Sequence, residues 1–442
     1  MRAGTDGAAA AAKANTFADK LAALRSAGLS AEAAWTLLRT CAQGAVTHHL
    51  RANHDTTWVD PFDDVIFSSL EHLVGAPLDA SQRTQATMRL KDGGCSLPSA
   101  RLTAAAAYAA SWALVLHEVA AGAGFATWED FRARCPLTHQ ALVQADADLL
   151  AQGVKDDHFD WLGAFQHPAP KLQGIWGEAR SVATRARLLT QLDEEERVAL
   201  RGAGGPGAGG FLLPVEEGHP ALPDAHFLAA LKMRLRCLVC PDGTTCQHRR
   251  ADGTVCGATL DPKGWHAKKC EVGGSRNARH DNMRDWHAPL HTRLTGHHAV
   301  KEQRVPGWDR VNRQTGELQL ARLDVATRDP ATGQPVYVDW SITCEHSTYA
   351  PRRQACSNND GVAAAAMVRE KRARYPPEHG NLVPLVFETG GRPSDEAAEF
   401  IRTYGQDMDT AERGAALGTV WRQLSRRLQA GNAEMVLSAL SR

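Results

Sequence analysis

Two short β-branched runs in the C-terminal half of the chain each carry an aspartate. Asp324 lies in RLDVATRD and Asp339 lies in VYVDWSIT, and a Thr-Gly turn between them predicts adjacent strands of a hairpin. A later helical segment, AAAAMVREKRARY, can carry Lys371 back toward both acids. Two carboxylates that hold a divalent cation, with a lysine that offsets charge on a phosphate, form a metal-dependent phosphodiesterase site. We therefore predict that Asp324 and Asp339 bind Mg²⁺ and that Lys371 is their catalytic cation.

Other readings of these residues are open at this stage. Aspartates beside a hairpin and a lysine in a charged helix are more often solvated surface groups. Glu302, in the strand before Asp324, is predicted to supply a third oxygen ligand or to position water, although an isolated glutamate is more often exposed. If Lys371 does not reach the acids, Lys301 or Arg322 becomes the candidate for the positive partner.

A cysteine-rich segment upstream, CQHRRADGTVCGATLDPKGWHAKKC, has the composition of a zinc site. Cys246, Cys256, His266 and Cys270 supply three thiolates and one imidazole, which suit a tetrahedral zinc ion. The four-residue step from His266 to Cys270 fits one helical turn, so both can reach the same ion. The interval before Cys256 is longer than in a standard knuckle, and Cys240 is an alternative to Cys246. Because four protein ligands leave no open position, this zinc is predicted to be structural.

The helix that follows the cysteine segment begins with basic residues. Arg279 and His280 open it, and Arg276 and Arg284 lie nearby. A basic helix start suits phosphate contact, because backbone N–H groups and guanidinium charge act in the same direction. We predict these four residues as DNA contacts, against the alternative of an ordinary solvated helix.

Composition sets broad limits on the protein. Its 442 residues are enough for two or more domains, and Lys+Arg and Asp+Glu balance at 50 each, so any basic surface must be local. Five of the ten cysteines crowd between Cys237 and Cys270, which favours metal binding over a disulfide scaffold. No apolar run approaches the roughly 20 residues of a membrane span. The expectation is a soluble, intracellular protein with no membrane partner.

The order of segments predicts an α/β protein with a helical N-terminal module. Amphipathic helical patterns fill residues 1–201, and GAGGPGAGG at 202–210 predicts a flexible linker. Residues 211–275 hold a lead-in helix and the zinc segment. Residues 276–442 predict a small mixed sheet flanked by helices, with two closing helices. The strands are expected near HAVKEQRV, LQLARLDVAT, VYVDWSIT and NLVPLVFET.

In combination, these motifs resemble the restriction-like endonuclease domain, of the PD-(D/E)XK type, at the C-terminus of one class of non-LTR retrotransposon polyproteins. The resemblance covers roughly 211–400. Upstream, RLKDGGCSLPSARLTAAAAYAASW resembles the helical region that follows the reverse transcriptase in such polyproteins. The matching residues are Cys246, Cys256, His266, Cys270, Arg279, His280, Glu302, Asp324, Asp339, Lys371 and Tyr375.

The resemblance implies a restriction-like fold with a structural zinc and a Mg²⁺-dependent endodeoxyribonuclease. Such a domain would nick target DNA, leaving a 3′ hydroxyl that primes reverse transcription, and Tyr375 would join the DNA contacts. The implied partners are DNA, retroelement RNA and the parent element's reverse transcriptase, with a nuclear location in a eukaryote. Leu323 replaces the family's usual proline, and no aromatic-x-Asp-Asp polymerase motif occurs, so polymerase activity is not predicted. The alternatives are an inactive nucleic-acid-binding remnant and a host nuclease of the same fold.

Overall fold

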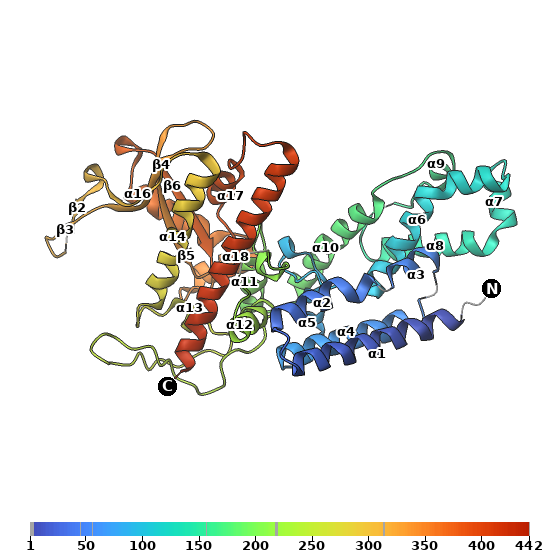
Figure 1. Cartoon of the computed structure of the whole chain (residues 1–442), viewed down its shortest axis with the longest axis horizontal. Coiled ribbons are helices and arrows are strands. Elements are labelled where there is room, and N and C mark those ends of the chain that lie inside the picture. Colours follow the sequence, from blue (N-terminus) through green and yellow to red (C-terminus); the bar gives the residue numbers. More distant parts are fainter. Residues whose placement is uncertain are drawn as a thin grey trace. The chain divides into compact units, whose positions relative to one another are not determined.

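A computed structural model describes residues 4–44, 46–54, 56–155, 157–216, 220–312 and 314–441. The chain forms two compact units, coloured along the sequence in Figure 1. The first comprises Met1–Arg89 and Cys95–Gln191, and the second comprises Leu90–Gly94 and Leu192–Arg442. The boundary therefore falls between Gln191 and Leu192, before the glycine-rich segment that the sequence marked as the linker.

The first unit is helical, as predicted. Its core forms where the alanine-rich helix α6 packs against α3, α8 and α9, with Trp128, Phe131 and Trp161 filling the space between helices. Alanine side chains allow such close helix packing at little cost in side-chain entropy. The helices of this unit are α1 (Gly4–Ser26), α2 (Ala31–Gly44), α3 (Thr47–Ala52), α4 (Val59–Val74), α5 (Ala80–Thr87), α6 (Ala100–Ala123), α7 (Trp128–Arg134), α8 (Pro136–Ala151), α9 (Trp161–Gln166) and α10 (Leu172–Gln191).

Among the described residues, α6 is the one helix long and apolar enough to cross a membrane. The sequence prediction that no such run exists was wrong on this point. Half of the apolar stretch is buried inside the protein, and Tyr108, Ala109 and Leu116 belong to the core just described. A buried core helix passes the same length and composition test, so the apolar character of α6 has a sufficient explanation in packing.

The second unit contains the predicted small mixed sheet. Its four strands lie in the order β1-β4-β5-β6, with β1, β4 and β5 antiparallel and β6 parallel to β5. The parallel pair requires a crossover connection, which α15 and α16 supply. The strands are β1 (Val300–Arg304), β4 (Arg322–Arg328), β5 (Pro335–Thr343) and β6 (Leu382–Glu388), with β2 (Arg310–Val311) and β3 (Leu318–Gln319) forming a separate ribbon.

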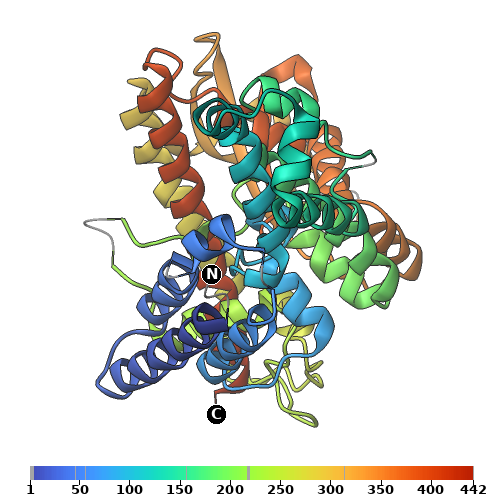
Figure 2. The ribbon, with the colours of Figure 1, turned by 90° about the vertical axis from the view of Figure 1, so that its right-hand side faces the viewer.

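Helices cover this sheet on both faces. On one face, α14, α17 and α18 enclose the largest core of the unit around Trp340 and Phe387, and α14 runs beside α18 in both views (Figure 1, Figure 2). On the other face, Ala364 and Val368 of α16 pack on Val386 of β6. The helices are α11 (Glu194–Gly202), α12 (Asp224–Arg234), α13 (Trp265–Lys269), α14 (Ser275–Thr295), α15 (Ala350–Asn358), α16 (Val362–Arg374), α17 (Asp395–Arg402) and α18 (Thr410–Leu440).

The glycine-rich segment 202–210 is a packed part of the second unit, which corrects the prediction of a flexible linker. A Cβ atom at Gly207 would lie 2.2 Å from the Trp421 ring, and one at Gly204 would lie 2.5 Å from the Arg392 guanidinium. Gly210 likewise approaches the α18 backbone, 2.9 Å from the Trp421 carbonyl. The glycines are there because the backbone must pass close to its neighbours, and not because the chain must flex.

Arg234, at the end of α12, ties three separate stretches of the second unit together. Its buried guanidinium donates to the carbonyls of Gly94 at 2.8 Å, Leu90 at 2.8 Å and Ala203 at 3.0 Å. A single side chain thus satisfies carbonyls of the Leu90–Gly94 segment and of the glycine-rich segment.

Candidate active site and metal-binding cluster

The β4–β5 hairpin opens at the position of Asp324. Regular pairing runs from Arg328 opposite Pro335 to Val325 opposite Val338. Beyond it, the Trp340 N–H donates to Asp324 Oδ2 at 2.7 Å, so a carboxylate takes the place of a ladder partner. Glu302, on β1 in the stretch that pairs with this part of β4, has a left-handed φ of +53°. Interrupted strand pairing and a left-handed residue change the direction of nearby side chains, here at the end of the hairpin where the two acids lie.

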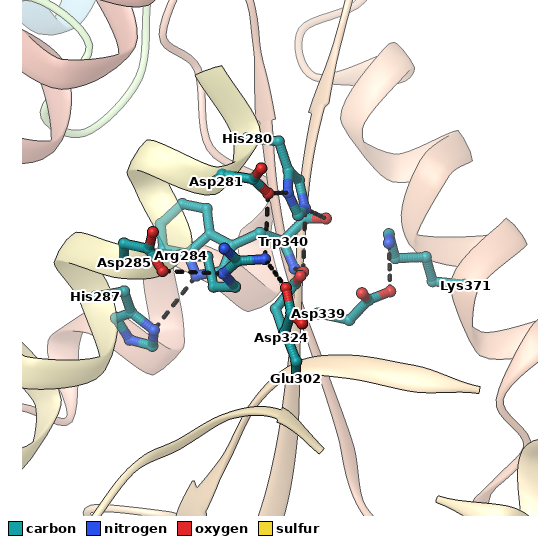
Figure 3. Close-up of polar contacts among 10 residues, drawn as sticks. All are labelled: His280, Asp281, Arg284, Asp285, His287, Glu302, Asp324, Asp339, Trp340 and Lys371. Atoms are coloured by element: carbon teal, nitrogen blue, oxygen red, sulfur yellow. Dashed lines mark hydrogen bonds and ion pairs between the residues drawn. The ribbon is translucent and has the colours of Figure 1, made fainter. Parts of the chain in front are cut away.

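The crossover helix brings Lys371 to this end of the sheet, as predicted. Its ammonium contacts Asp339 Oδ2 (Figure 3). Ala363, Ala364 and Val368 are the buried positions of α16, which fixes the rotation of the helix on the sheet. The lysine side chain is only 15% exposed. Lys371 is therefore not one more solvated cation of a charged helix. The two alternatives lie elsewhere, Lys301 against Asp285 and Arg322 near Glu302.

The two aspartates differ in how they are stabilised. Burial raises the pKa of Asp339 to about 6; the nearby charge of Asp324 adds to the rise and Lys371 opposes it. Burial also disfavours ionisation of Asp324, but its hydrogen bond to His280 and the positive charge of that ring outweigh burial and lower its pKa. Two carboxylates and two basic side chains thus share a desolvated site in which each charge depends on the others.

His280 takes part in the acid site itself, a role that differs from the DNA contact predicted for it. Its Nε2 lies 3.1 Å from Asp324 Oδ2 and 3.2 Å from the Trp340 carbonyl oxygen. The hydrogen bond to Asp324 raises the pKa of His280 against the effect of burial. The Asp324 carboxylate and the Trp340 carbonyl oxygen therefore both lie close to this ring.

A buried aromatic network lies behind the site, and no motif in the sequence marks it. The Trp340 indole donates to His287 Nδ1 at 3.3 Å, and His287 Nε2 lies 2.7 Å from the Tyr404 hydroxyl. Burial lowers the pKa of His287 to about 3, so the ring is neutral. This network holds the side chain of Trp340, whose backbone N–H and carbonyl face Asp324 and His280.

Glu302 does not join the two aspartates. Its carboxylate is bound by Arg284 and is half exposed, at 50%. Arg284 also pairs with Asp281 at 3.2 Å and with Asp285 at 3.1 Å, so its charge is neutralised by acids. Figure 3 shows this ion-pair cluster between α14 and β1, separate from the Lys371–Asp339 contact. Neither the predicted third ligand nor the predicted phosphate contact of Arg284 has the expected placement.

The remaining predicted DNA contacts divide into exposed and buried residues. Arg276 is exposed and contacts Glu271. Arg279 is only 5% exposed and donates to the Lys268 carbonyl and the Asn432 side chain, so it does not lie on an exposed basic helix start. Tyr375 is also buried, in a cluster around Trp308. The sequence of α14 did not show which of its basic residues would turn toward α18.

The cysteine segment forms a compact group of four potential metal ligands. The ligand atoms of Cys246, Cys256, His266 and Cys270 all lie within 4.8 Å of one another. The Cys246 and Cys270 sulfurs are 3.9 Å apart, close to the roughly 3.8 Å that two zinc–sulfur bonds impose at a tetrahedral ion. Cys240 is not part of the group, which decides between the two candidates for the first ligand in favour of Cys246. The Cys3His set could hold a metal, and its chemistry is consistent with zinc.

Local hydrogen bonds position these ligands. The Cys246 N–H donates to the Ala258 carbonyl, which closes a loop that brings Cys256 back beside it. Asp261 accepts the backbone N–H groups of Trp265 and His266 and so starts the short helix α13, which aims His266 at the thiols. Val436 of α18 packs in the same cluster. The segment is therefore folded onto the second unit and is not a free zinc finger.

Neither protein-family models nor curated proteins give a match to this chain. Within the described ranges, the Cys3His set is also the one group of three or more histidine, cysteine and acidic side chains that converge closely enough for a metal. Asp324 and Asp339 do not by themselves form such a group.

Proposed function

We propose that the second unit is a metal-dependent DNA endonuclease with a restriction-like fold. The observation that carries the proposal is the contact between Lys371 and Asp339 at the end of the sheet where Asp324 also lies. These three residues come from two strands and a crossover helix. Burial raises the pKa of Asp339, whereas the contact with His280 outweighs burial and lowers the pKa of Asp324. Perturbed acids held against a cation are typical of catalytic sites.

The oxygen atoms at this site suit a hard divalent cation. The carboxylates of Asp324 and Asp339 and the carbonyl of Trp340 would hold Mg²⁺, which prefers such oxygen ligands. When bound, Mg²⁺ would lower the pKa of a water molecule and offset charge on the scissile phosphate. Lys371 then has a role of its own, because its compact ammonium can leave Asp339 and donate to a phosphate oxygen. His280 keeps Asp324 ionised and ready to act as a ligand.

The Cys3His segment would bind zinc as a structural ion beside this site, as the resemblance to retrotransposon endonuclease domains implies. On that resemblance, the substrate is target DNA, and the nicked 3′ end would prime reverse transcription by the polymerase of the parent element on its RNA. An intracellular, nuclear location in a eukaryotic host belongs to the same proposal. The rival reading is a remnant that binds nucleic acid without cleaving it, and the ordered acid–lysine contact favours the active enzyme.

A plasmid-nicking assay with Mg²⁺ tests the proposal. Asp339→Ala should lower the rate by about 10³-fold or more, because it removes a metal ligand. Lys371→Arg should also lower the rate markedly, because a forked guanidinium does not fit where an ammonium contacts one carboxylate. Asp407→Ala, at an exposed loop position, is the matched control and should nick like wild type. Wild-type cleavage by folded Asp339→Ala protein would refute the assignment.

A further inference from the structure

A cavity of about 610 Å³ lies in the second unit between α14 and α18, bounded also by the chain that leads into α12. On α14 it is lined by Ser275, Ala278 and Asn282, whereas His280 and Arg284 of the same helix face the acid site and its ion pairs. The cavity is therefore distinct from the proposed catalytic centre, and one helix separates the two.

Arginine dominates the charge of this cavity. Two of the arginines are held by partners at the rim: Arg422 pairs with Glu216 at 2.7 Å, and Arg426 donates to the Pro220 carbonyl at 2.9 Å. Arg427 instead donates to the neutral side chain of Asn282 at 3.0 Å. The charged residues that line the cavity are Arg279, Arg422, Arg426, Arg427, Glu216, Glu434 and, when protonated, His226.

Two of these guanidinium groups retain unused hydrogen-bonding capacity. The Nε–H groups of Arg279 and Arg422 are buried and have no acceptor in the part of the chain that the structure describes. In the same described part, neither Arg279 nor Arg427 forms an ion pair with a carboxylate, although Arg279 is only 5% exposed. Arg427 is exposed, so an anion in the cavity can approach its guanidinium, and the positive charge of Arg279 beside it would favour such an anion.

The lining between the arginines is small and apolar. Ala278 on α14 and Ala430 and Gly431 on α18 leave room on the cavity wall, and Leu222 and Pro223 add apolar surface. Guanidinium groups beside apolar surface suit a ligand that carries phosphates on one side and flat rings on the other. The cavity has the volume of a small-ligand site, which favours one or a few nucleotides over a double helix.

We propose that this arginine-lined cavity binds a short stretch of single-stranded nucleic acid, with a phosphate on Arg427, in the positive field of the neighbouring arginines, and bases against the apolar wall. This inference deepens the proposed endonuclease function by naming a second contact for its nucleic-acid partner. The binding itself requires no catalysis. A nucleic-acid strand bound in the cavity would lie on the side of α14 away from the acid pair. Helix α14 would then separate it from the strand that is cleaved at the acid pair.

Fluorescence anisotropy with a labelled single-stranded 12-mer, at several salt concentrations, tests the proposal. The full-length chain carrying Asp339→Asn is used, so that cleavage does not consume the probe. Arg427→Gln should weaken binding by about 10-fold. It should also lower the slope of log affinity against log salt concentration by about one. Ala430→Phe keeps every charge but fills the cavity, and it should also weaken binding. Arg402→Gln removes an exposed arginine of α17 away from the cavity and should leave binding unchanged.

The outcomes separate this inference from the proposed cleavage. Wild-type affinity in both Arg427→Gln and Ala430→Phe, with zinc content and circular dichroism unchanged, would overturn the cavity as the binding site. Equal loss in Arg402→Gln would show diffuse charge attraction and would overturn it too. Competition by AMP that fails in Arg427→Gln would support recognition of a nucleoside phosphate. If the chain with Asp339 intact does not nick DNA but binding still depends on Arg427, the cleavage proposal fails and this inference stands.

Discussion

Glu388 offers a test of how the second unit balances buried charge. It ends β6 and is only 2% exposed, and its Oε1 accepts the N–H groups of Ala363 and Ala364 at the start of α16. Glu345 is equally buried and accepts a hydrogen bond from the Thr389 hydroxyl at 2.6 Å. Burial raises the pKa of Glu388 to about 7, and the charge of Glu345 adds to the rise. Ionisation of Glu388 therefore destabilises the folded state.

The expected size of the effect follows from that pKa. A rise in the pKa from the ordinary value of 4.5 to about 7 corresponds to about 3 kcal/mol, at about 1.36 kcal/mol per pH unit. Between these two values the folded state binds more protons than the unfolded state, so stability falls as pH rises through this window. Glu388→Gln keeps the volume and the acceptor oxygen but cannot ionise. It should raise the free energy of unfolding by about 2–3 kcal/mol near pH 8 and change it little near pH 4.5.

Urea unfolding followed by tryptophan fluorescence at the two pH values measures this difference. Glu399→Gln, which removes an exposed carboxylate from α17, is the matched control and should shift stability by no more than about 0.5 kcal/mol. A Glu388→Gln protein that is less stable than wild type near pH 8 would refute the reasoning. Such a result would mean that ionised Glu388 makes a net favourable interaction with the α16 amides.

Two further predictions concern the metal cluster and the packing of α18. Cys256→Ser should lose the single zinc expected per chain and locally unfold its segment, whereas Cys240→Ser should keep the metal. Elemental analysis of natively purified protein measures the zinc content of both variants. Zinc retained by Cys256→Ser would contradict the ligand set. A Cβ at Gly431 would lie 2.6 Å from the buried Arg279 Cγ, so Gly431→Ala should destabilise by about 1–3 kcal/mol. Gly414→Ala, on the same helix with nothing within 4 Å, should be neutral or stabilising in thermal unfolding.

The arrangement of the acid site was largely predictable from sequence, because strand and crossover patterns constrain it. The hairpin carrying Asp324 and Asp339 and the helix carrying Lys371 form as the alternating runs and the alanine-rich helix predicted. The part that His280 plays could not be derived, since it depends on how α14 rotates when it packs on the sheet. Glu302 was misplaced for a related reason: its carboxylate is bound by Arg284 of α14, a contact that also depends on how this helix packs, and it stays half exposed, as isolated glutamates more often do.

Composition was a poor guide where tertiary contacts decide the role of a residue. Nine residues rich in glycine predict a flexible linker, yet a Cβ at Gly207 would meet the Trp421 ring and one at Gly210 would meet the α18 backbone. From the sequence, Arg279 is predicted as a surface contact for phosphate. In the structure α18 covers it and Asn432 binds its guanidinium. In both cases the deciding partner lies more than 150 positions away along the chain, beyond the reach of any local pattern.

The contacts of Arg234 determine how the protein can be divided for experiments. A fragment starting at Leu192 would retain the sheet, the cysteine cluster and α18, but it would lack Leu90–Gly94. Arg234 would then lose two of its carbonyl acceptors. Each unsatisfied buried N–H costs about 1–3 kcal/mol, so the fragment should express poorly even though the cut falls at the boundary between units. Fusing the segment Leu90–Gly94 to this fragment should restore the two carbonyl acceptors and the yield of expressed protein.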